Sequence, residues 1–92
     1  GCFFFSETAT GRVPGNALNA IDTTGAGDGF VAGLLSGLLN SLKPGEAFVP
    51  PEQAKLEECC RFANAVGALT TTKRGAVPAL PTREQVEDFL QP

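Results

Sequence analysis

Residues 22–28 read DTTGAGD and lie between a short apolar run and a long apolar pattern with a helical period. Gly25 and Gly27 let the backbone curl tightly, because neither residue carries a side chain. The curl opens into the predicted helix, whose first N–H groups have no intrahelical acceptor and point toward it. Such donors at the positive end of a helix dipole bind anions, most often phosphate. The stretch therefore predicts a phosphate site at the start of a helix.

Two carboxylates bracket this turn, Asp22 and Asp28. Asp28 has a structural alternative, because an aspartate at a helix start is stabilised by the helix dipole. A fixed base beside a phosphate site is, however, what phosphoryl transfer to a hydroxyl requires. The glycines and the second aspartate favour this catalytic interpretation. Asp22 has an alternative of its own, as a carboxylate that accepts hydrogen bonds from N–H groups of the turn.

Size and composition restrict the possible functions. The 92 residues form one domain at most, and their 42% hydrophobic and 18% charged content is that of a globular protein. The formal net charge of −3 argues against nucleic acid or an anionic membrane as a partner. No apolar run approaches the length of a membrane span. The run Phe3-Phe4-Phe5 resembles a strand entered partway through a domain, so we expect a fragment.

The three cysteines are Cys2, Cys59 and Cys60. Their odd number and the absence of a Cys-x-x-Cys spacing make a disulfide framework or a zinc site a poor interpretation. They are predicted to be small core residues in a reducing compartment, the cytoplasm or a plastid. The chain has no histidine, which excludes Ser-His-Asp and Cys-His catalysis within it.

The β-strand pattern predicts a hairpin and one further strand. Residues 1–5 form a short aromatic strand, and a turn signal at residues 8–11 precedes a return strand at residues 12–14. Residues 18–21 are predicted to form another strand, whose carboxyl end presents the turn at residues 22–28. Ligands of open α/β sheets commonly bind at that position.

Three helices are predicted after the turn. The first, at residues 27–41, has a glycine row (Gly29, Gly33, Gly37) that predicts close approach of another backbone, since each glycine costs roughly 1 kcal/mol against alanine. The second runs from Pro51 through about residue 69, and residues 70–72 interrupt its pattern. Thr82 and Gln85 form a capping box for a last short helix. A broad apolar face of the first helix consists of Phe30, Val31, Leu34, Leu35, Leu38, Leu39 and Leu42.

The DTTGAGD stretch resembles the second signature of the ribokinase-like (PfkB) carbohydrate kinases, and its surroundings are similar to plant-type fructokinases. The neighbouring matches are GRVPG at residues 11–15, FANA at residues 62–65 and TKRGAVPALPT at residues 72–82. The resemblance implies an α/β fold, the C-terminal nucleotide-binding part of a ribokinase-like three-layer sandwich, with a hairpin and strand followed by three helices. Residues 1–92 would be the C-terminal part of a single kinase domain.

This resemblance also implies an activity. The complete protein would use ATP, with Mg²⁺, to phosphorylate a sugar hydroxyl, and fructose conversion to fructose 6-phosphate is favoured. Sugar and ATP are the expected ligands, without nucleic acid or membrane, and a homodimer is allowed. Because the family's sugar-binding residues lie largely before residue 1, the isolated 92 residues are expected to be inactive. Two alternatives stay open: a catalytically inactive structural subunit of a larger assembly, and a nucleotide-binding module without transfer activity.

The roles of single residues follow from the same resemblance. Asp28 would be the general base, and the N–H groups of Gly25, Ala26 and Gly27 would form the anion hole, with both glycines also binding nucleotide. Asn64 would lie beside the adenine, although a helix-packing amide is its structural alternative. The solvated interpretation is favoured for the side chains of Lys73 and Arg74. A monovalent cation, K⁺ in the family, would be held mostly by main-chain carbonyls at Asp22, Thr24, Thr70, Lys73 and Gly75; at Ala79 some relatives offer a hydroxyl ligand instead.

Overall fold

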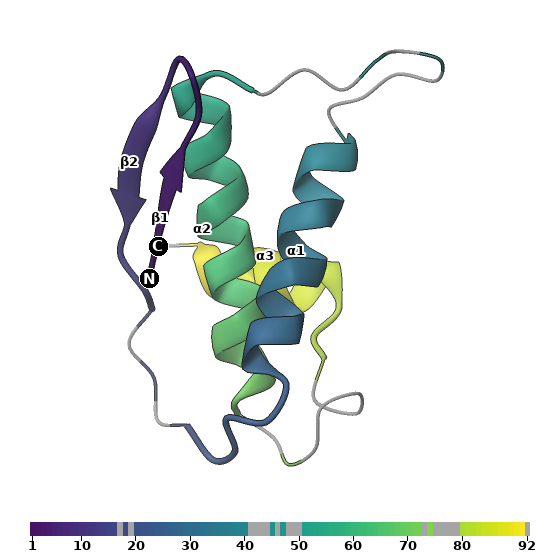
Figure 1. Cartoon of the computed structure of the whole chain (residues 1–92). Coiled ribbons are helices and arrows are strands. Elements are labelled where there is room, and N and C mark those ends of the chain that lie inside the picture. The colour runs from purple at the N-terminus through teal and green to yellow at the C-terminus, as the bar shows by residue number, and fades with distance from the viewer. Residues whose placement is uncertain are drawn as a thin grey trace.

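The computed structural model describes residues 1–16, 18, 20–40, 45, 47, 51–72, 74 and 80–91. Its element order is β1 (Cys2–Phe5), β2 (Thr10–Val13), α1 (Ala26–Asn40), α2 (Gln53–Thr70) and α3 (Arg83–Leu90). Helix α2 is central, because it contacts the hairpin, α1 and α3 (Figure 1). The hairpin and α1 lie on opposite sides of α2 in this view. Within the described residues, the two strands and three helices confirm the predicted α/β class.

Strands β1 and β2 form the predicted antiparallel hairpin, with Cys2 opposite Val13 and Phe5 opposite Thr10. Side chains alternate between the two faces of a strand. Cys2 and Phe4 are half-buried, whereas Phe3 and Phe5 are 81% and 87% exposed. One face of the hairpin therefore packs on α2, and the other carries exposed aromatic rings.

The strand predicted at residues 18–21 is wrong for the described residues, since Leu18, Ala20 and Ile21 are not in a strand. A strand needs a neighbouring strand to receive its backbone hydrogen bonds. Instead, the Ile21 N–H donates to the Thr71 carbonyl at the end of α2, at 2.7 Å. The segment that leads into the DTTGAGD turn is thus attached to a helix end.

Helices α1 and α2 meet along the predicted glycine row. A Cβ atom on Gly29 would lie 2.7 Å from the Thr70 Oγ1, and one on Gly37 would lie 3.1 Å from the Cys59 Sγ. At Gly33 the Cβ atom would lie 3.1 Å from the Ala63 Cα, so the predicted close approach of another backbone occurs at the middle of the row. By contrast, the apolar face predicted on α1 is buried only in part: Phe30, Leu34 and Leu38 are half-buried, and Val31, Leu35 and Leu39 are exposed.

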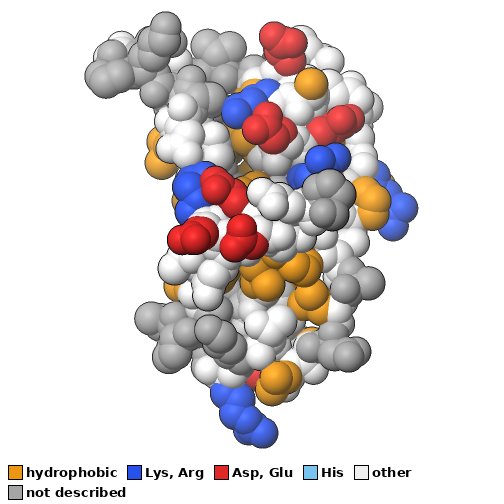
Figure 2. All heavy atoms as spheres, turned by 180° about the vertical axis from the view of Figure 1, so that it is seen from behind, with side chains coloured by type: hydrophobic (Ala, Val, Ile, Leu, Met, Phe, Trp, Pro, Cys, Tyr) orange, Lys and Arg blue, Asp and Glu red, His pale blue; other side chains and the backbone are white. Residues whose placement is uncertain are grey.

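Helix α3 begins with the predicted capping box: the Gln85 N–H donates to the Thr82 Oγ1, and the Thr82 N–H donates to the Gln85 Oε1. Val86 of α3 packs with Ala65 and Val66 of α2 in a small core. Seen from behind, the surface carries acidic and basic side chains with hydrophobic ones gathered between them (Figure 2). No helix in the described ranges is long and apolar enough to cross a membrane.

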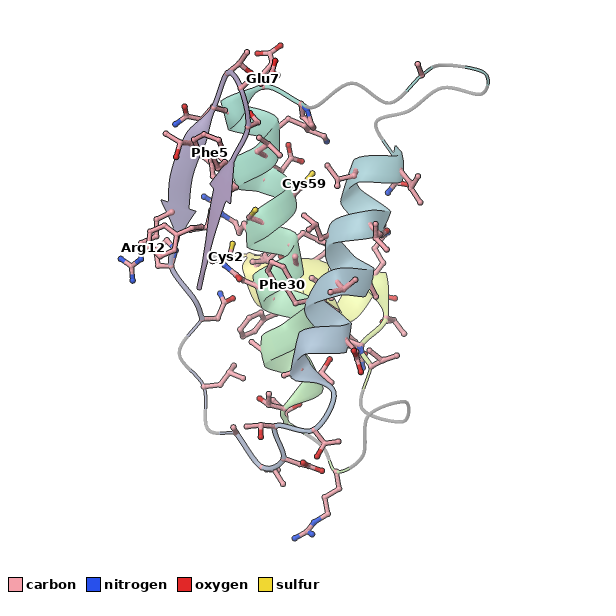
Figure 3. The ribbon with its side chains drawn as sticks, in the orientation of Figure 1. Cys2, Phe5, Glu7, Arg12, Phe30 and Cys59 are labelled. Carbon is pink, nitrogen blue, oxygen red and sulfur yellow. The ribbon has the colours of Figure 1, made fainter. Side chains whose placement is uncertain are left out.

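All three cysteines are free thiols, and Cys59 and Cys60 are buried as predicted. Figure 3 shows Cys59 between α2 and α1, with Phe30 of α1 close to α2. Burial raises the pKa of the Cys60 thiol to about 12, and a hydrogen bond with the Cys2 side chain adds to this shift. Burial also raises the pKa of Cys59. Both groups are therefore neutral core thiols.

Candidate phosphate and cation site at the start of α1

The DTTGAGD turn leads directly into α1. Gly25 has a φ of +79°, a left-handed conformation that residues with a Cβ atom adopt at a cost. Its carbonyl accepts the first helical hydrogen bond, from the Gly29 N–H at 2.8 Å. The amides of Gly27 and Asp28 precede this bond, so the helix itself offers them no acceptor. The turn therefore directs N–H groups outward at the positive end of the helix dipole.

Gly27 is a glycine for a reason other than packing. A Cβ atom added at this position would meet no described atom within 4 Å. Helix propensity favours alanine over glycine by roughly 1 kcal/mol, so neither sterics nor local stability within the described chain requires glycine here. The space at the Cβ position is thus open within the described chain, which suits a ligand that approaches the backbone closely.

Of the three amides predicted to form the anion hole, one already has a partner. The Ala26 N–H donates to the Thr23 carbonyl at 3.2 Å. To bind an anion, this amide would have to share or release that bond. The Gly27 amide is thus the donor that the geometry favours most, and the anion hole as a whole stays a prediction.

The two aspartates differ in their surroundings. Asp28 lies in the first turn of α1 and is exposed. Asp22 is half-buried, and its Oδ1 accepts a hydrogen bond from the Thr24 N–H at 2.9 Å. This bond confirms the structural alternative for Asp22, a carboxylate that fixes the turn. The cation role of Asp22 stays a prediction.

The end of α2 lies against the same turn. The N–H groups of Ile21 and Asp22 both donate to the Thr71 carbonyl, at 2.7 and 3.0 Å. Thr70, which the cation prediction includes, is buried one residue earlier. The structure therefore brings Asp22 and Thr70 to one place. Two further residues of that prediction, Lys73 and Gly75, lie outside the described residues, as does Ala79. Arg74 is exposed, in agreement with its solvated interpretation.

Asn64 has a structural role that the sequence left as an alternative. Its side chain is 8% exposed, and its Nδ2 donates to the carbonyls of Val13 and Pro14, both at 3.3 Å. The amide thus attaches α2 to the end of β2. It lies six residues before Thr70 on α2, about 9 Å along the helix axis. Its contact with an adenine stays a prediction.

Thr71 is the residue that sequence reasoning missed. The three consecutive threonines at residues 70–72 indicated only an interruption of the helix pattern. Nothing in one sequence indicates that a carbonyl at this point accepts two hydrogen bonds from a segment 50 residues away. The available signal was three consecutive threonines at a helix end with no glycine directly after them. Serine and threonine side chains often donate to the carbonyls of a helix end, so this pattern indicates a hydroxyl that ends the helix.

Comparisons with known proteins identify the family of the chain. The model of the pfkB family carbohydrate kinases matches residues 1–83. The probable fructokinase-6, chloroplastic, of Arabidopsis thaliana is 48% identical over 98% of this chain and 22% of its own length. Fructokinase-2 of Oryza sativa subsp. japonica is 50% identical over 98% of this chain and 25% of its own length. The chain thus spans about a quarter of the length of these relatives.

Solved structures of fructokinases are also similar to this chain. The fructokinase of Vibrio cholerae O395 in its fructose-, ADP- and calcium-bound form has a TM-score of 0.79 and 37% identity, over 97% of this chain and 27% of that one. A double mutant of that enzyme, bound to fructose, ADP and potassium, has a TM-score of 0.71 and 38% identity, over 90% of this chain and 25% of that one. The chain belongs to the pfkB family of carbohydrate kinases.

Proposed function

We propose that residues 1–92 are the C-terminal, nucleotide-binding part of a single kinase domain, and that the complete protein transfers the γ-phosphoryl group of ATP to a hydroxyl of fructose. The fructokinases of Arabidopsis and Oryza support the choice of sugar through their identity of about one half over nearly this whole chain. The Vibrio cholerae enzyme, solved with fructose and ADP, supports the choice of nucleotide and sugar. We place the protein in the cytoplasm or a plastid, the second because one relative is named chloroplastic.

The observation that carries this proposal is the geometry of the turn before α1. Asp28, an exposed carboxylate, directly follows Gly27 at the positive end of α1. A Cβ atom at Gly27 would meet no described atom within 4 Å. A phosphate near the Gly27 amide and a hydroxyl near the Asp28 carboxylate would then be neighbours. Holding the two reactants together in this way supplies a large part of the rate enhancement in phosphoryl transfer.

Each group of the turn has a distinct task in the proposed reaction. The Asp28 carboxylate accepts the proton of the attacking sugar hydroxyl. The N–H groups of Gly25, Ala26 and Gly27 donate to the phosphate oxygens, where negative charge is stabilised during transfer. Asp22 stabilises the turn by accepting a hydrogen bond from the Thr24 N–H. Asn64 would contribute to the adenine pocket through the segment that it attaches at Val13 and Pro14.

The residues present fit a monovalent cation behind the turn better than a protein-bound divalent ion. Asp22 is half-buried beside the carbonyl end of α2, and carbonyl oxygens with one carboxylate suit K⁺. Within the described ranges, no three histidine, cysteine, aspartate or glutamate side chains cluster as metal ligands. Mg²⁺ bound to ATP would supply neutralisation of the phosphate charge.

The substitution Asp28→Asn in the complete protein tests this function. We expect fructose-dependent ADP release to fall by about 10²–10⁴-fold, the usual contribution of general acid–base catalysis. ATP affinity, measured by calorimetry, should hardly change, because the carboxylate does not bind the nucleotide. The matched control is Asp88→Asn, which removes an exposed carboxylate from α3 and should leave the rate unchanged.

Two outcomes would reject the proposed function in favour of its alternatives. A wild-type protein that binds ATP without sugar-dependent turnover would be a nucleotide-binding module. One that neither binds ATP nor phosphorylates a sugar would be a structural subunit. Near-normal turnover of the Asp28→Asn variant would instead reject only the base and leave Asp28 as a helix-start residue.

A further inference from the structure

We propose that Thr71 is a positioning residue, which fixes the DTTGAGD turn by holding its own carbonyl in place through its hydroxyl. The consequence for catalysis rests on the kinase function proposed above, whereas the consequence for the structure does not. Neither the base, the anion hole nor the cation ligands include Thr71, so this role is additional to theirs.

The Thr71 carbonyl is the point at which the turn is attached to the rest of the chain. It accepts the N–H groups of two successive residues, Ile21 at 2.7 Å and Asp22 at 3.0 Å. A carbonyl oxygen has two lone pairs and can accept both bonds. Asp22 in turn bonds the Thr24 N–H, and Gly25 follows directly. Only Thr23 and Thr24 therefore separate this attachment from the first glycine of the anion site.

The hydroxyl of Thr71 holds the helix end that presents this carbonyl. Thr71 is 9% exposed, and its Oγ1 donates to the Ala68 carbonyl at 2.6 Å. Its N–H donates to the same carbonyl at 3.1 Å. Residue 71 is thus fixed by two bonds to one acceptor, and its own carbonyl points toward the turn. A helix C-terminus commonly needs glycine or a side-chain partner to satisfy its last carbonyls, and here the hydroxyl supplies that partner.

The neighbouring threonines make similar bonds but with different consequences. The Thr70 Oγ1 donates to the Val66 carbonyl at 2.7 Å, and it packs against Gly29, where a Cβ atom would lie 2.7 Å from it. Thr72 Oγ1 donates to the Leu69 carbonyl at 2.7 Å. The amides of Ile21 and Asp22 are directed to Thr71 and not to Thr72. Thr72 therefore provides a control with the same residue type, the same kind of bond and the same helix end.

The decisive variants in the complete protein are Thr71→Val, Thr71→Ser and Thr72→Val. Valine keeps the shape of threonine and removes the hydroxyl, whereas serine keeps the hydroxyl. We expect Thr71→Val to lower kcat by about three- to tenfold, as the loss of one buried hydrogen bond suggests, with KM for ATP unchanged. Thr71→Ser should restore most of kcat. Thr72→Val should remain within about twofold of wild type, because surface or half-buried changes away from the attachment have small effects.

A second readout does not depend on kinase activity. In hydrogen–deuterium exchange, the peptide that contains Ile21 and Asp22 should exchange faster in Thr71→Val than in wild type, and Thr72→Val should leave it unchanged. If the wild-type protein lacks sugar kinase activity, the proposed function fails and exchange alone decides the positioning role. Wild-type exchange in Thr71→Val, or equal effects of Thr71→Val and Thr72→Val in both measurements, would overturn the proposal.

Discussion

Gly33 of α1 lies so close to Ala63 of α2 that a Cβ atom added to the glycine would be 3.1 Å from the Ala63 Cα. The same atom would lie 3.0 Å from the Val66 Cγ2. At this point α2 therefore approaches the backbone of α1 with both a backbone atom and a side chain. This contact sets the distance between α1, which carries the Asp28 carboxylate, and α2, whose end holds the segment before the turn.

The substitution Gly33→Ala should destabilise the complete protein, because a backbone atom cannot move aside as a side chain can. Overpacking of this kind costs about 1–3 kcal/mol, and the better helix propensity of alanine returns roughly 1 kcal/mol. We expect a net loss of about 1 kcal/mol, seen as a lower midpoint in urea unfolding. An unchanged midpoint would mean that the two helices separate at little cost.

Gly27→Ala should keep the stability of the protein and lower its turnover, the opposite of Gly33→Ala. Its new Cβ atom would meet no described atom within 4 Å, so stability should stay the same or rise. That atom would nevertheless occupy the space beside the amide proposed to bind phosphate. We expect turnover to fall by about 10²-fold, as misplacement of a reacting group by 1 Å can cause. Gly33→Ala is the matched control, since it should lose stability and keep its turnover below the unfolding midpoint. Full activity of Gly27→Ala would show that no phosphate approaches this amide.

Cys59 and Cys60 should resist alkylation in the folded protein. Their exposed fractions are 3% and 4%. Burial raises the pKa of Cys60 to about 12 from 9.0, so its reactive thiolate is much scarcer at pH 8 than that of an exposed cysteine. Iodoacetamide followed by mass spectrometry should label both residues slowly until urea is added. Cys2, which is half-buried, is the internal comparison and should react sooner. Labelling of Cys60 at the rate seen in urea would contradict its core position.

The local elements could be predicted because each depends on neighbours in the sequence. The hairpin, the capping box at Thr82 and Gln85, and the glycine row all follow from short-range chemistry, and the structure contains them. The glycine row even predicted a tertiary contact, since only close approach justifies three costly residues in one helix.

The errors concern groups whose partners are distant in sequence. Residues 18–21 have a strand-like pattern, yet the Ile21 amide finds a helix carbonyl instead of a strand. Val31, Leu35 and Leu39 belong to the predicted apolar face of α1 and are exposed within the described chain, because the periodicity of a face does not tell which part of it is covered. Asn64 illustrates the same limit, because its bonds to Val13 and Pro14 span about 50 residues and leave no trace in the local pattern.

The cation prediction depends on oxygen ligands that lie between the turn and the end of α2. Asp22 is half-buried and lies beside the end of α2, where Thr70 is buried. A monovalent ion at this point would draw oxygen ligands together and fix the N–H groups of Gly25 and Gly27. Because such preorganisation acts mainly on the transition state, it should appear in turnover more than in ATP affinity.

We therefore expect the complete protein to turn over faster in K⁺ than in Na⁺ or tetramethylammonium. Ionic strength must be equal in all three salts, because screening alone alters the binding of a charged nucleotide. Asp22→Ala should reduce both the rate and its dependence on the cation. Asp22→Asn separates the two roles of this residue: its amide oxygen can still accept the Thr24 N–H, which the Asp22 carboxylate holds at 2.9 Å, but it lacks the charge that attracts a cation. Loss of the K⁺ preference in Asp22→Asn would support the cation site, whereas equal rates of the wild type in the three salts would leave Asp22 as a turn residue alone.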